Sequence, residues 1–415
     1  MMSARDFEHK QIIFAMLNEG EKISFKNDNL VIRREDNSIK LQSTCYRLFV
    51  LFIAGHFSLT SGLMEKARKF SFTIVFLNYY MRPYAILPAK AEGNVILRRT
   101  QYYYEDFDIG AYIISNKIHN QNFLLKKIRN KTENLKKIIS LMEVYEKSVL
   151  VPGLSLQEIM GVEGVAARGY FEQLFREYDW SARRPRVKHD FINCLMDIGY
   201  TILFNLVNAM LELFGFDTYV GVLHREFFHR KSLVCDIVEP FRPIIDACLI
   251  KALNLGQIHE NDFYVDQGQY FIGGKKAVPY IKIMLDALLE HKDKMFLYVQ
   301  SYYRAFVRQK PISQFPVFIW RGSVVLLVTY DIADDKLRTS FSKFLSKYGR
   351  RLQYSVFEIQ NSDRLLRILI LEITKTYEKK FTEEDSVIIF EIGDDGQKYC
   401  FGYAKHDDER LLMIT

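Results

Sequence analysis

Three carboxylates and one imidazole in the middle of the chain have the chemistry of a metal site. Asp236 and Glu239 are three residues apart, so a helix would place both carboxylates on one face. Glu163 lies between two glycines in the segment 161–164, and glycine permits the close approach of a ligand. With His224, these side chains form a mostly oxygen-donor set that suits Mg²⁺ or Mn²⁺ better than structural zinc. The residue types therefore favour a divalent-metal site at Glu163, His224, Asp236 and Glu239.

Two ordinary explanations fit the same four residues. Acidic pairs at this spacing are common on solvated helix faces, and a single histidine is often a hydrogen-bonded structural residue. The basic surroundings favour the metal site, because metal ions activate the oxygens of a phosphodiester while arginine side chains clamp its phosphates. We expect phosphate contacts from the flanking basic residues, although the run 183–188 also fits a solvated loop. These residues are Arg168, Arg183, Arg184, Arg186, Lys188, Arg225, Arg230, Lys231 and Arg242.

The excess positive charge lies in one part of the chain. There are 57 Lys and Arg residues against 50 Asp and Glu residues, a net charge of +7. After residue 320 there are 15 basic and 16 acidic side chains, so the first 320 residues hold 42 basic and 34 acidic ones, a net of +8. This bias favours a polyanionic partner, either nucleic acid or an anionic membrane surface.

Length and composition exclude several classes of protein. A chain of 415 residues, 49% of them hydrophobic, predicts about two to four domains and excludes a disordered chain, a collagen-like repeat and a disulfide-stapled mini-protein. We expect no membrane insertion, because the most apolar stretch, 48–55, is too short to cross a bilayer. The five cysteines are scattered without a C-x-x-C pair, which predicts reduced core thiols in a cytosolic protein.

Residues 1–308 contain the elements that must position these side chains. Residues 1–98 read as β-rich, because short apolar segments alternate with turn sequences; strands are expected at 23–26, 30–34, 39–42, 46–53 and 72–77, and a short helix at 63–69. In residues 99–308 apolar side chains recur every three or four residues, which predicts an all-α domain. Its long helices are expected from about residue 110, from about residue 154 behind a capping box of Ser155 and Glu158, and at 188–214 and 278–308.

The last part of the chain has a different pattern. Pro311 and Pro316 indicate an interdomain linker at 309–320. Residues 321–415 then read as strand 324–330, helix 335–348, strand 353–359, helix 362–377 and strand 387–392, an order typical of a ferredoxin-like domain. The predicted fold class is therefore multidomain α+β: a β-rich N-terminal domain, an all-α catalytic domain and a C-terminal ferredoxin-like α/β domain.

Three separated segments around the candidate metal ligands, 161–171, 223–224 and 232–243, resemble the CRISPR-associated spacer integrase family Cas1. The order and rough spacing of Glu163, His224 and the Asp236–Glu239 pair match the metal ligands of that family. A β-rich domain followed by a helical domain also fits it. The resemblance covers roughly residues 10–310, and the opening portion is most similar to members from type V systems.

The segments 328–332, 347–351 and 353–358 resemble the companion subunit of the same machinery, the Cas2 family. In that family the Asp after the first strand is the proposed metal ligand, which is Asp331 here. An Asp at a strand end is, however, more often a turn or capping residue. The resemblance therefore implies a Cas1–Cas2 fusion whose C-terminal domain bridges the assembly rather than acting as an independent nuclease.

The resemblance implies a function in spacer acquisition. Short invader-derived duplex DNA would be integrated into a CRISPR repeat array through attack of a DNA 3′-OH on a repeat phosphodiester. Glu163, His224 and Asp236 would hold Mg²⁺ or Mn²⁺, Glu239 would complete the shell directly or through water, and the basic residues would bind DNA. The expected partners are the duplex fragment, CRISPR repeat DNA and further copies of the chain, with integrase-domain dimers bridged by a C-terminal-domain dimer in the prokaryotic cytoplasm. Two alternatives stay open: a metal-dependent endonuclease acting on branched DNA in repair, and a non-catalytic DNA-binding scaffold.

Overall fold

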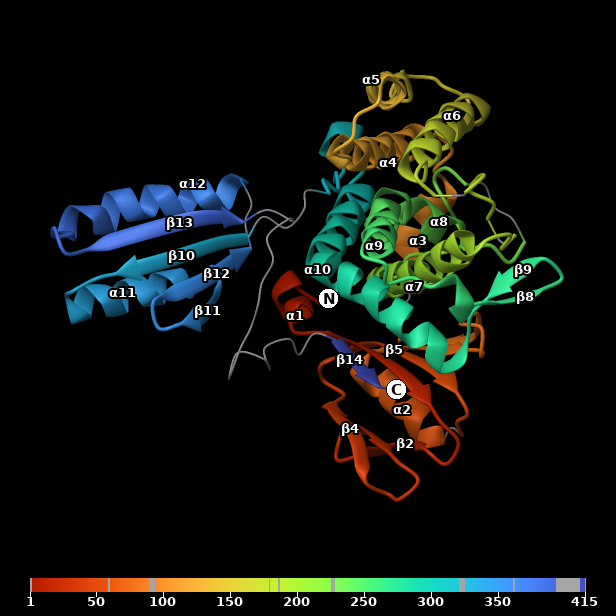
Figure 1. Ribbon diagram of the computed structural model, residues 1–415, viewed down its shortest axis with the longest axis horizontal. Helices are drawn as coiled ribbons and strands as arrows, with labels where there is room; N and C mark the ends of the chain where they lie inside the picture. The colour runs from red at the N-terminus through yellow and green to blue at the C-terminus, as the bar shows by residue number, and fades with distance from the viewer. Residues whose placement is uncertain are drawn as a thin grey trace. The chain divides into compact units, whose positions relative to one another are not determined.

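The computed structural model describes residues 2–58, 60–89, 94–178, 180–185, 187–224, 228–320, 325–360, 363–392 and 411–414 (Figure 1). The chain divides into two units, one of residues 1–320 with 409–415 and one of residues 321–408. The division after Trp320 coincides with the predicted start of the C-terminal domain. The β-rich and helical parts, predicted as separate domains, share the first unit.

A five-stranded sheet lies at the centre of the β-rich part. Its order is β14-β1-β5-β6-β7, with β1 at Gln11–Leu17, β5 at Leu48–Gly55, β6 at Thr73–Leu77, β7 at Pro83–Leu87 and β14 at Leu411–Ile414. β1, β5 and β6 pair in parallel, and β7 is antiparallel to β6. All of β1 is buried, and its alternate side chains enter two different cores, with Phe14 in one and Ala15 in the other. Both faces of this sheet are therefore covered, as its nearly continuous apolar strands require.

A second, three-stranded sheet packs against one of these cores. It consists of the antiparallel strands β2 (Lys22–Lys26), β3 (Asn29–Arg33) and β4 (Ile39–Thr44). These strands, β5, β6 and the helix α2 (Ser61–Phe70) confirm the elements predicted for this region. The short helix α1 (Ala4–Glu8), β1 and β7 were not predicted, although Gln11–Leu17 is an apolar run of strand length.

The last described residues return to the first sheet. Strand β14 (Leu411–Ile414) pairs in parallel with β1, so that Ile12 lies opposite Leu411 and Ala15 opposite Ile414. The sequence placed all of 321–415 in the C-terminal domain, and the structure instead assigns residues 409–415 to the first unit. The periodicity of a four-residue strand carries no information about the sheet it joins, because its pairing partner lies about 400 residues away in sequence.

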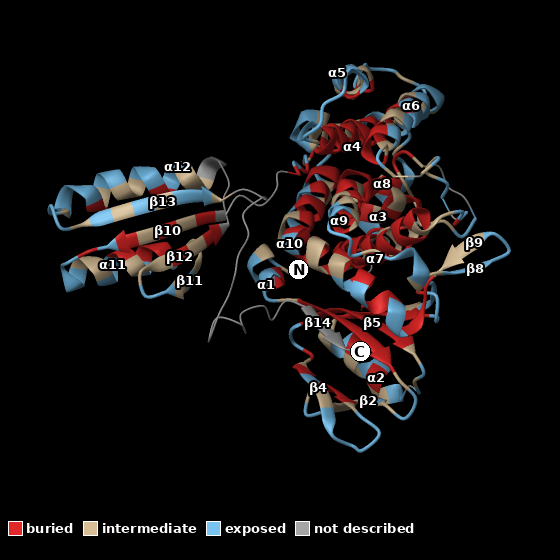
Figure 2. Ribbon diagram, viewed as in Figure 1, coloured by how far each residue is buried: buried red, intermediate tan, exposed pale blue. Residues whose placement is uncertain are grey.

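The helical part surrounds a single large core (Figure 2). The predicted helices are confirmed, and Ser155 and Glu158 form the predicted capping box, with the Glu158 N–H donating to Ser155 Oγ at 3.3 Å. The elements are α3 (Val95–Tyr102), α4 (Asp108–Lys127), α5 (Glu133–Ser148), α6 (Leu156–Leu174), α7 (Phe191–Phe214), α8 (Ser232–Ile237), the 3₁₀ turn η1 (Glu239–Phe241), α9 (Arg242–Asn254), the 3₁₀ turn η2 (Glu260–Asp262), the hairpin strands β8 (Tyr264–Asp266) and β9 (Gln269–Phe271), α10 (Gly274–Val307) and the 3₁₀ turn η3 (Ile312–Gln314).

Helix α7 is long and apolar enough by length and composition alone to cross a membrane, with a mean hydropathy of 1.5 over its most apolar window. In the structure 78% of that window is buried inside the first unit. It packs against α9 and α10, whose inward faces are also buried (Figure 2). Burial in the core therefore accounts for its apolar composition.

The segment predicted as an interdomain linker is part of the first unit. Phe315, Phe318 and Trp320 are all buried in the large core, with exposed fractions of 7%, 3% and 7%. The prediction of an interdomain linker at 309–320 is therefore wrong for its second half, which packs in the core of the first unit. The two prolines do end the helical pattern, but the aromatic side chains between and after them have apolar surface to bury.

The second unit has the predicted ferredoxin-like topology. Its antiparallel sheet has the order β11-β12-β10-β13, and two helices cover one face. The elements are β10 (Val325–Asp331), α11 (Asp335–Leu345), β11 (Arg350–Gln353), β12 (Val356–Gln360), α12 (Asp363–Glu372), the π-helical turn η4 (Ile373–Tyr377), the 3₁₀ turn η5 (Glu378–Lys380) and β13 (Ser386–Ile392). Phe341 and Phe357, both fully buried, lie at the centre of its core.

Candidate active site

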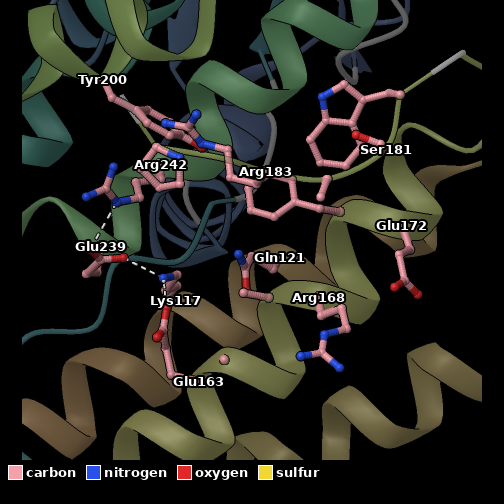
Figure 3. Close-up of a pocket in the computed structure, with 16 residues that line it drawn as sticks. Lys117, Gln121, Glu163, Arg168, Glu172, Ser181, Arg183, Tyr200, Glu239 and Arg242 are labelled. Carbon is pink, nitrogen blue, oxygen red and sulfur yellow. Dashed lines mark hydrogen bonds and ion pairs between the residues drawn. The ribbon is translucent and has the colours of Figure 1, made fainter. Parts of the chain in front are cut away.

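A buried lysine lies between two of the predicted carboxylates (Figure 3). The Nζ atom of Lys117, on α4, is 2.5 Å from Oε1 of Glu163 on α6 and 2.6 Å from Oε2 of Glu239 in η1. The exposed fractions of the three side chains are 8%, 19% and 6%. Three elements that are distant in sequence therefore meet at one charged cluster, and its positive member was not predicted.

The charges in this cluster stabilise one another. Burial acts to raise the pKa of Glu239. The positive charges of Arg242 and Lys117, and more weakly that of His224, outweigh burial and lower this pKa from its ordinary value of 4.5 to about 2. Burial lowers the pKa of Lys117, and the carboxylates of Glu239 and Glu163 outweigh that effect, so its pKa lies above the ordinary value. Glu239 is therefore a carboxylate and Lys117 an ammonium at neutral pH, as paired buried charges should be.

A second network, formed by Arg242, Tyr200, Asp246 and Tyr170, contacts Glu239 through Arg242. The Nε atom of Arg242 donates to Glu239 Oε1 at 3.0 Å, and the guanidinium group lies 4.6 Å from the ring centroid of Tyr200. The Tyr200 hydroxyl donates to Asp246 at 2.5 Å, and the Tyr170 hydroxyl donates to the same carboxylate at 2.9 Å. Burial raises the pKa of Asp246 to about 6 although both hydroxyls act to lower it. These contacts fix Arg242, and thereby one oxygen of Glu239.

Asp236 faces a different direction from Glu239. Its Oδ2 accepts the N–H groups of Val222 and Leu223 at 2.7 and 3.1 Å. Its Oδ1 accepts the N–H of His224 at 3.0 Å and lies 2.6 Å from the Nδ1 atom of that imidazole. Its side chain is 0% exposed. Asp236 therefore holds the loop that carries His224, and its oxygens are fully used there.

The prediction that Asp236 and Glu239 share a helix face is wrong. Helix α8 ends at Ile237 and the 3₁₀ turn η1 begins at Glu239, so the two carboxylates belong to different elements. Pro240 has no N–H to continue an α-helix, which explains the change. Gly221 makes the other side of this arrangement possible, because a Cβ atom there would lie 2.6 Å from Asp236 Oδ2.

The side chains of Glu163, His224 and Glu239 are of types that bind a divalent cation, although in this structure their donor atoms do not surround a common position. No group of three or more His, Cys, Asp or Glu side chains that could hold a metal ion occurs among the described residues. Glu163 and Glu239 supply oxygen donors, and His224 is near enough to Glu239 to lower its pKa. The Oε2 atom of Glu239 is buried and lies 2.6 Å from the Lys117 Nζ atom. Such a donor set suits Mg²⁺ or Mn²⁺.

A pocket of about 460 Å³ opens beside the charged cluster (Figure 3). Its lining includes Phe171, Trp180 and Tyr200 as aromatic surface and Gln121, 1% exposed, as a buried amide. Gln121 Oε1 and Trp180 Nε1 are both buried and, within the described part of the chain, have no hydrogen-bond partner. The lining therefore includes Gln121 Oε1 as an acceptor, Trp180 Nε1 as a donor, and stacking surface next to the carboxylates.

The predicted basic residues fall into three groups. Arg168, Arg183 and Arg242 line the pocket, where Arg183 donates to Asp197 at 2.6 Å. Arg184 is exposed, Arg230 is half-buried, and Lys231 donates to Asn208 and Glu212 at 2.8 and 3.1 Å. Arg186 and Arg225 lie outside the described residues.

Two remaining predictions concern single side chains. Lys188 is 4% exposed, and its Nζ lies 5.4 Å from the Phe271 ring centroid. The structure therefore contradicts a phosphate contact for Lys188, because the hairpin of β8 and β9 covers it, and a hairpin was not among the predicted elements. Asp331 is exposed at the end of β10, where it lies opposite Ser386 of β13. Its role as a metal ligand stays a prediction.

Sequence reasoning missed several residues of this site, namely Lys117, Gln121, Trp180, Tyr200 and Asp246. One signal was available for the first two. Together with Asn116 and Asn120, these two residues interrupt the apolar pattern of 113–125. Polar side chains inside a buried helix need hydrogen-bond or ion-pair partners. The pattern could not name the partners of Lys117, because they come from α6 and η1.

Comparison with known proteins follows the same division of the chain. The family described as CRISPR associated protein Cas1 matches residues 15–282, and the family described as CRISPR associated protein Cas2 matches residues 324–399. A CRISPR-associated endonuclease Cas1 of Chlorobaculum tepidum is 26% identical over 281 residues, which cover 63% of this chain and 80% of that protein. A CRISPR-associated endonuclease Cas1 of Leptospira interrogans is 30% identical over 176 residues, or 40% of this chain and 69% of that protein.

Solved structures share the fold at lower identity. A Cas1 protein from Thermotoga maritima has a TM-score of 0.62 and 18% identity over 72% of this chain and 97% of its own. A casposase bound to integration product has a TM-score of 0.61 and 18% identity, covering 80% and 99%. A Cas6-RT-Cas1–Cas2 complex has a TM-score of 0.65 and 22% identity over 75% of this chain, which spans 36% of that longer polypeptide. The chain belongs to the Cas1 family, and with Cas2 in the same polypeptide it is a Cas1–Cas2 fusion of CRISPR spacer integration.

Proposed function

We propose that the first unit integrates DNA in a metal-dependent reaction at Glu163, Glu239 and His224. The observation that carries this proposal is the position of Lys117, whose Nζ bridges the two carboxylates at 2.5 and 2.6 Å. Two carboxylates that face one cation concentrate negative charge, and a divalent metal ion could bind the same oxygens if the Lys117 ammonium moved aside. When bound there, Mg²⁺ or Mn²⁺ would polarise a phosphodiester and stabilise the departing oxygen.

The role that we propose for Asp236 differs from the direct metal ligand expected from the resemblance. Glu239 points into the cluster and is proposed as a direct ligand. Asp236 uses both oxygens on the backbone of 222–224 and on His224 Nδ1, so we propose that it orients the imidazole and leaves Nε2 for the metal. A histidine ligand commonly has such a carboxylate on its other nitrogen.

The pocket beside the carboxylates is proposed to hold the end of the DNA. Its aromatic side chains offer stacking surface to an unpaired base, and Arg168 lies at its exposed side where a phosphate can be bound. The nucleophile would be the DNA 3′-OH, so the chain needs no nucleophile of its own. Gln121 Oε1 and Trp180 Nε1 would gain partners from the base or the backbone of the strand.

Binding of duplex DNA and repeat DNA is proposed to rest on the excess positive charge of the first 320 residues. The Cas2 unit is proposed to bridge the assembly through a dimer of its own, with dimers of the Cas1 unit on either side. The Cas2 match and the likeness of the fold to a Cas1–Cas2 complex support this arrangement.

Carboxylate variants separate catalysis from DNA binding. Glu163→Gln and Glu239→Gln should lose strand transfer while retaining most duplex affinity, because the affected residues lie at the reacting phosphate and not along the duplex. Glu133→Gln is the matched control, since that side chain is 88% exposed and forms an ion pair with Lys136 on the surface of α5. Unchanged strand transfer in Glu163→Gln would refute the assigned site, and loss of DNA binding in step with activity would point to a scaffold.

A further inference from the structure

Helix α4 has polar residues on two sides at the level of the active site. Lys117 and Gln121 line the pocket, and their sequence neighbours Asn116 and Asn120, also one turn apart, face the segment 318–320. Beyond Trp320 the chain continues into the Cas2 unit. Helix α4 therefore faces the active site with Lys117 and Gln121, and with Asn116 and Asn120 it binds residues 318–320, called here the exit segment.

Asn116 binds the exit segment as a neighbouring β-strand would. Its Nδ2 donates to the carbonyl oxygen of Phe318 at 2.8 Å, and its Oδ1 accepts the Phe318 N–H at 2.8 Å. The side chain is 4% exposed, so neither group has water as a ready alternative partner. The Asn116 amide thus binds both backbone groups of Phe318, and the Phe318 carbonyl oxygen also accepts from Asn120.

Asn120 joins the exit segment to the turn that carries Glu239. Its Oδ1 accepts the Trp320 N–H at 3.0 Å, and its Nδ2 donates to the carbonyl oxygens of Phe318 at 2.8 Å and Pro240 at 2.9 Å. The side chain is 0% exposed. Pro240 directly follows Glu239, so a single buried amide fixes both the exit segment and the backbone next to the catalytic carboxylate.

Aromatic packing adds a second link between the same two segments. The ring of Phe318 contacts Phe241 edge-on, with a centroid distance of 4.8 Å, and Phe241 is the residue after Pro240. At the end of the segment the Trp320 indole N–H donates to His291 Nε2 at 3.1 Å. The segment 318–320 is therefore held at both ends, contacts η1 through the Phe318 ring, and shares the Asn120 amide with the Pro240 carbonyl of η1.

We infer that Asn120 and the seated exit segment are positioning elements for Glu239. If 318–320 leaves α4, the Asn120 amide and the Pro240 carbonyl lose the packed environment that fixes them, and η1 is free to turn Glu239 away from Glu163. The geometry of the carboxylate pair thus depends on the segment through which Cas2 is attached. This inference rests on the proposed metal site, and it goes beyond that proposal by linking the site to the point of fusion.

Manganese affinity of the full-length chain tests the inference without using activity. Free Mn²⁺ is measured by electron paramagnetic resonance during titration of the wild type, Asn120→Ala, Trp320→Ala and Asn122→Ala. Asn122 is the matched control, because it is 2% exposed on the same helix but donates to Ile139 of α5. Asn120→Ala should weaken Mn²⁺ binding about tenfold, as loss of an outer-shell partner does. Asn122→Ala should leave it unchanged.

Trp320→Ala leaves α4 intact and should also weaken Mn²⁺ binding. The double variant should lose less than the sum of the two single losses, because both act through one seated segment. Mn²⁺ affinity that is equal in Asn120→Ala and Asn122→Ala would overturn the inference, whether both are unchanged or both reduced. The proposed function is judged separately: if Glu163→Ala does not reduce Mn²⁺ binding by the chain, the metal site itself is misassigned.

Discussion

Asp236 and His224 form a buried pair in which the carboxylate Oδ1 lies 2.6 Å from the imidazole Nδ1. The same carboxylate accepts three consecutive backbone N–H groups, those of residues 222–224. One side chain therefore determines both the path of the loop and the orientation of the ring at its end. Glu239, three residues later, makes none of these contacts and instead meets Lys117 and Arg242.

The first prediction concerns this carboxylate. Asp236→Asn should destabilise the first unit by about 1–3 kcal/mol, because an amide nitrogen cannot accept the N–H groups that Oδ2 now binds. His224→Ala should cost less stability, since the imidazole is partly exposed. Thermal denaturation of both variants in the absence of metal checks the order. A more stable Asp236→Asn than His224→Ala would contradict the loop-holding role.

The second prediction concerns the Lys117 ammonium group, which lies between Glu163 and Glu239. Lys117→Met leaves two facing carboxylates without their shared partner, which should cost about 3–5 kcal/mol in metal-free protein. Added Mn²⁺ should then raise the melting temperature more in Lys117→Met than in the wild type, because the metal no longer competes with an ammonium group. Lys136→Met, which removes an exposed ion pair, is the control. An equal or smaller Mn²⁺ effect in Lys117→Met would show that Lys117 does not occupy the metal position.

The third prediction is a pH dependence. Asp246 has a folded-state pKa of about 6 against an ordinary 3.8, so the folded chain holds the proton more tightly than the unfolded chain. Stability from this group is present below pH 3.8 and lost as pH rises through 6, a change of about 3 kcal/mol. Glu239 acts in the opposite direction but only below pH 4.5. Urea denaturation between pH 4.5 and 7 should show the decline in the wild type and a flatter profile in Asp246→Asn. Identical profiles would place the titration elsewhere.

The fourth prediction concerns the returning strand. Deletion of residues 409–415 removes β14 and exposes the edge of β1. Backbone amides of 11–17 that pair with β14 should then exchange hydrogen faster, while amides of β6 at 73–77, paired with β5 and β7, should stay protected. Hydrogen exchange followed by mass spectrometry compares the two peptides directly. Unchanged exchange in 11–17 would mean that β14 does not protect β1 in solution.

Local pattern predicted much of the fold, for reasons visible at individual residues. The apolar repeat of 113–125 and the Ser155–Glu158 capping box are local signals, and the helices they indicate are present. The site was less accessible. Glu163, His224 and Glu239 could be proposed from residue type, but the partners of Lys117 and Asn120 come from elements more than 40 residues away. Residue spacing alone also could not show that Asp236 and Glu239 belong to different elements, α8 and η1.

The most direct test of the account uses a labelled short duplex, a supercoiled plasmid that carries a CRISPR repeat, and the full-length chain. With Mg²⁺ or Mn²⁺, the label should become covalently joined to the plasmid, and EDTA or Glu239→Gln should abolish the joined product. Joining without any divalent metal would contradict the proposed site. Plasmid that is nicked but never labelled would contradict integration and identify a hydrolytic nuclease instead.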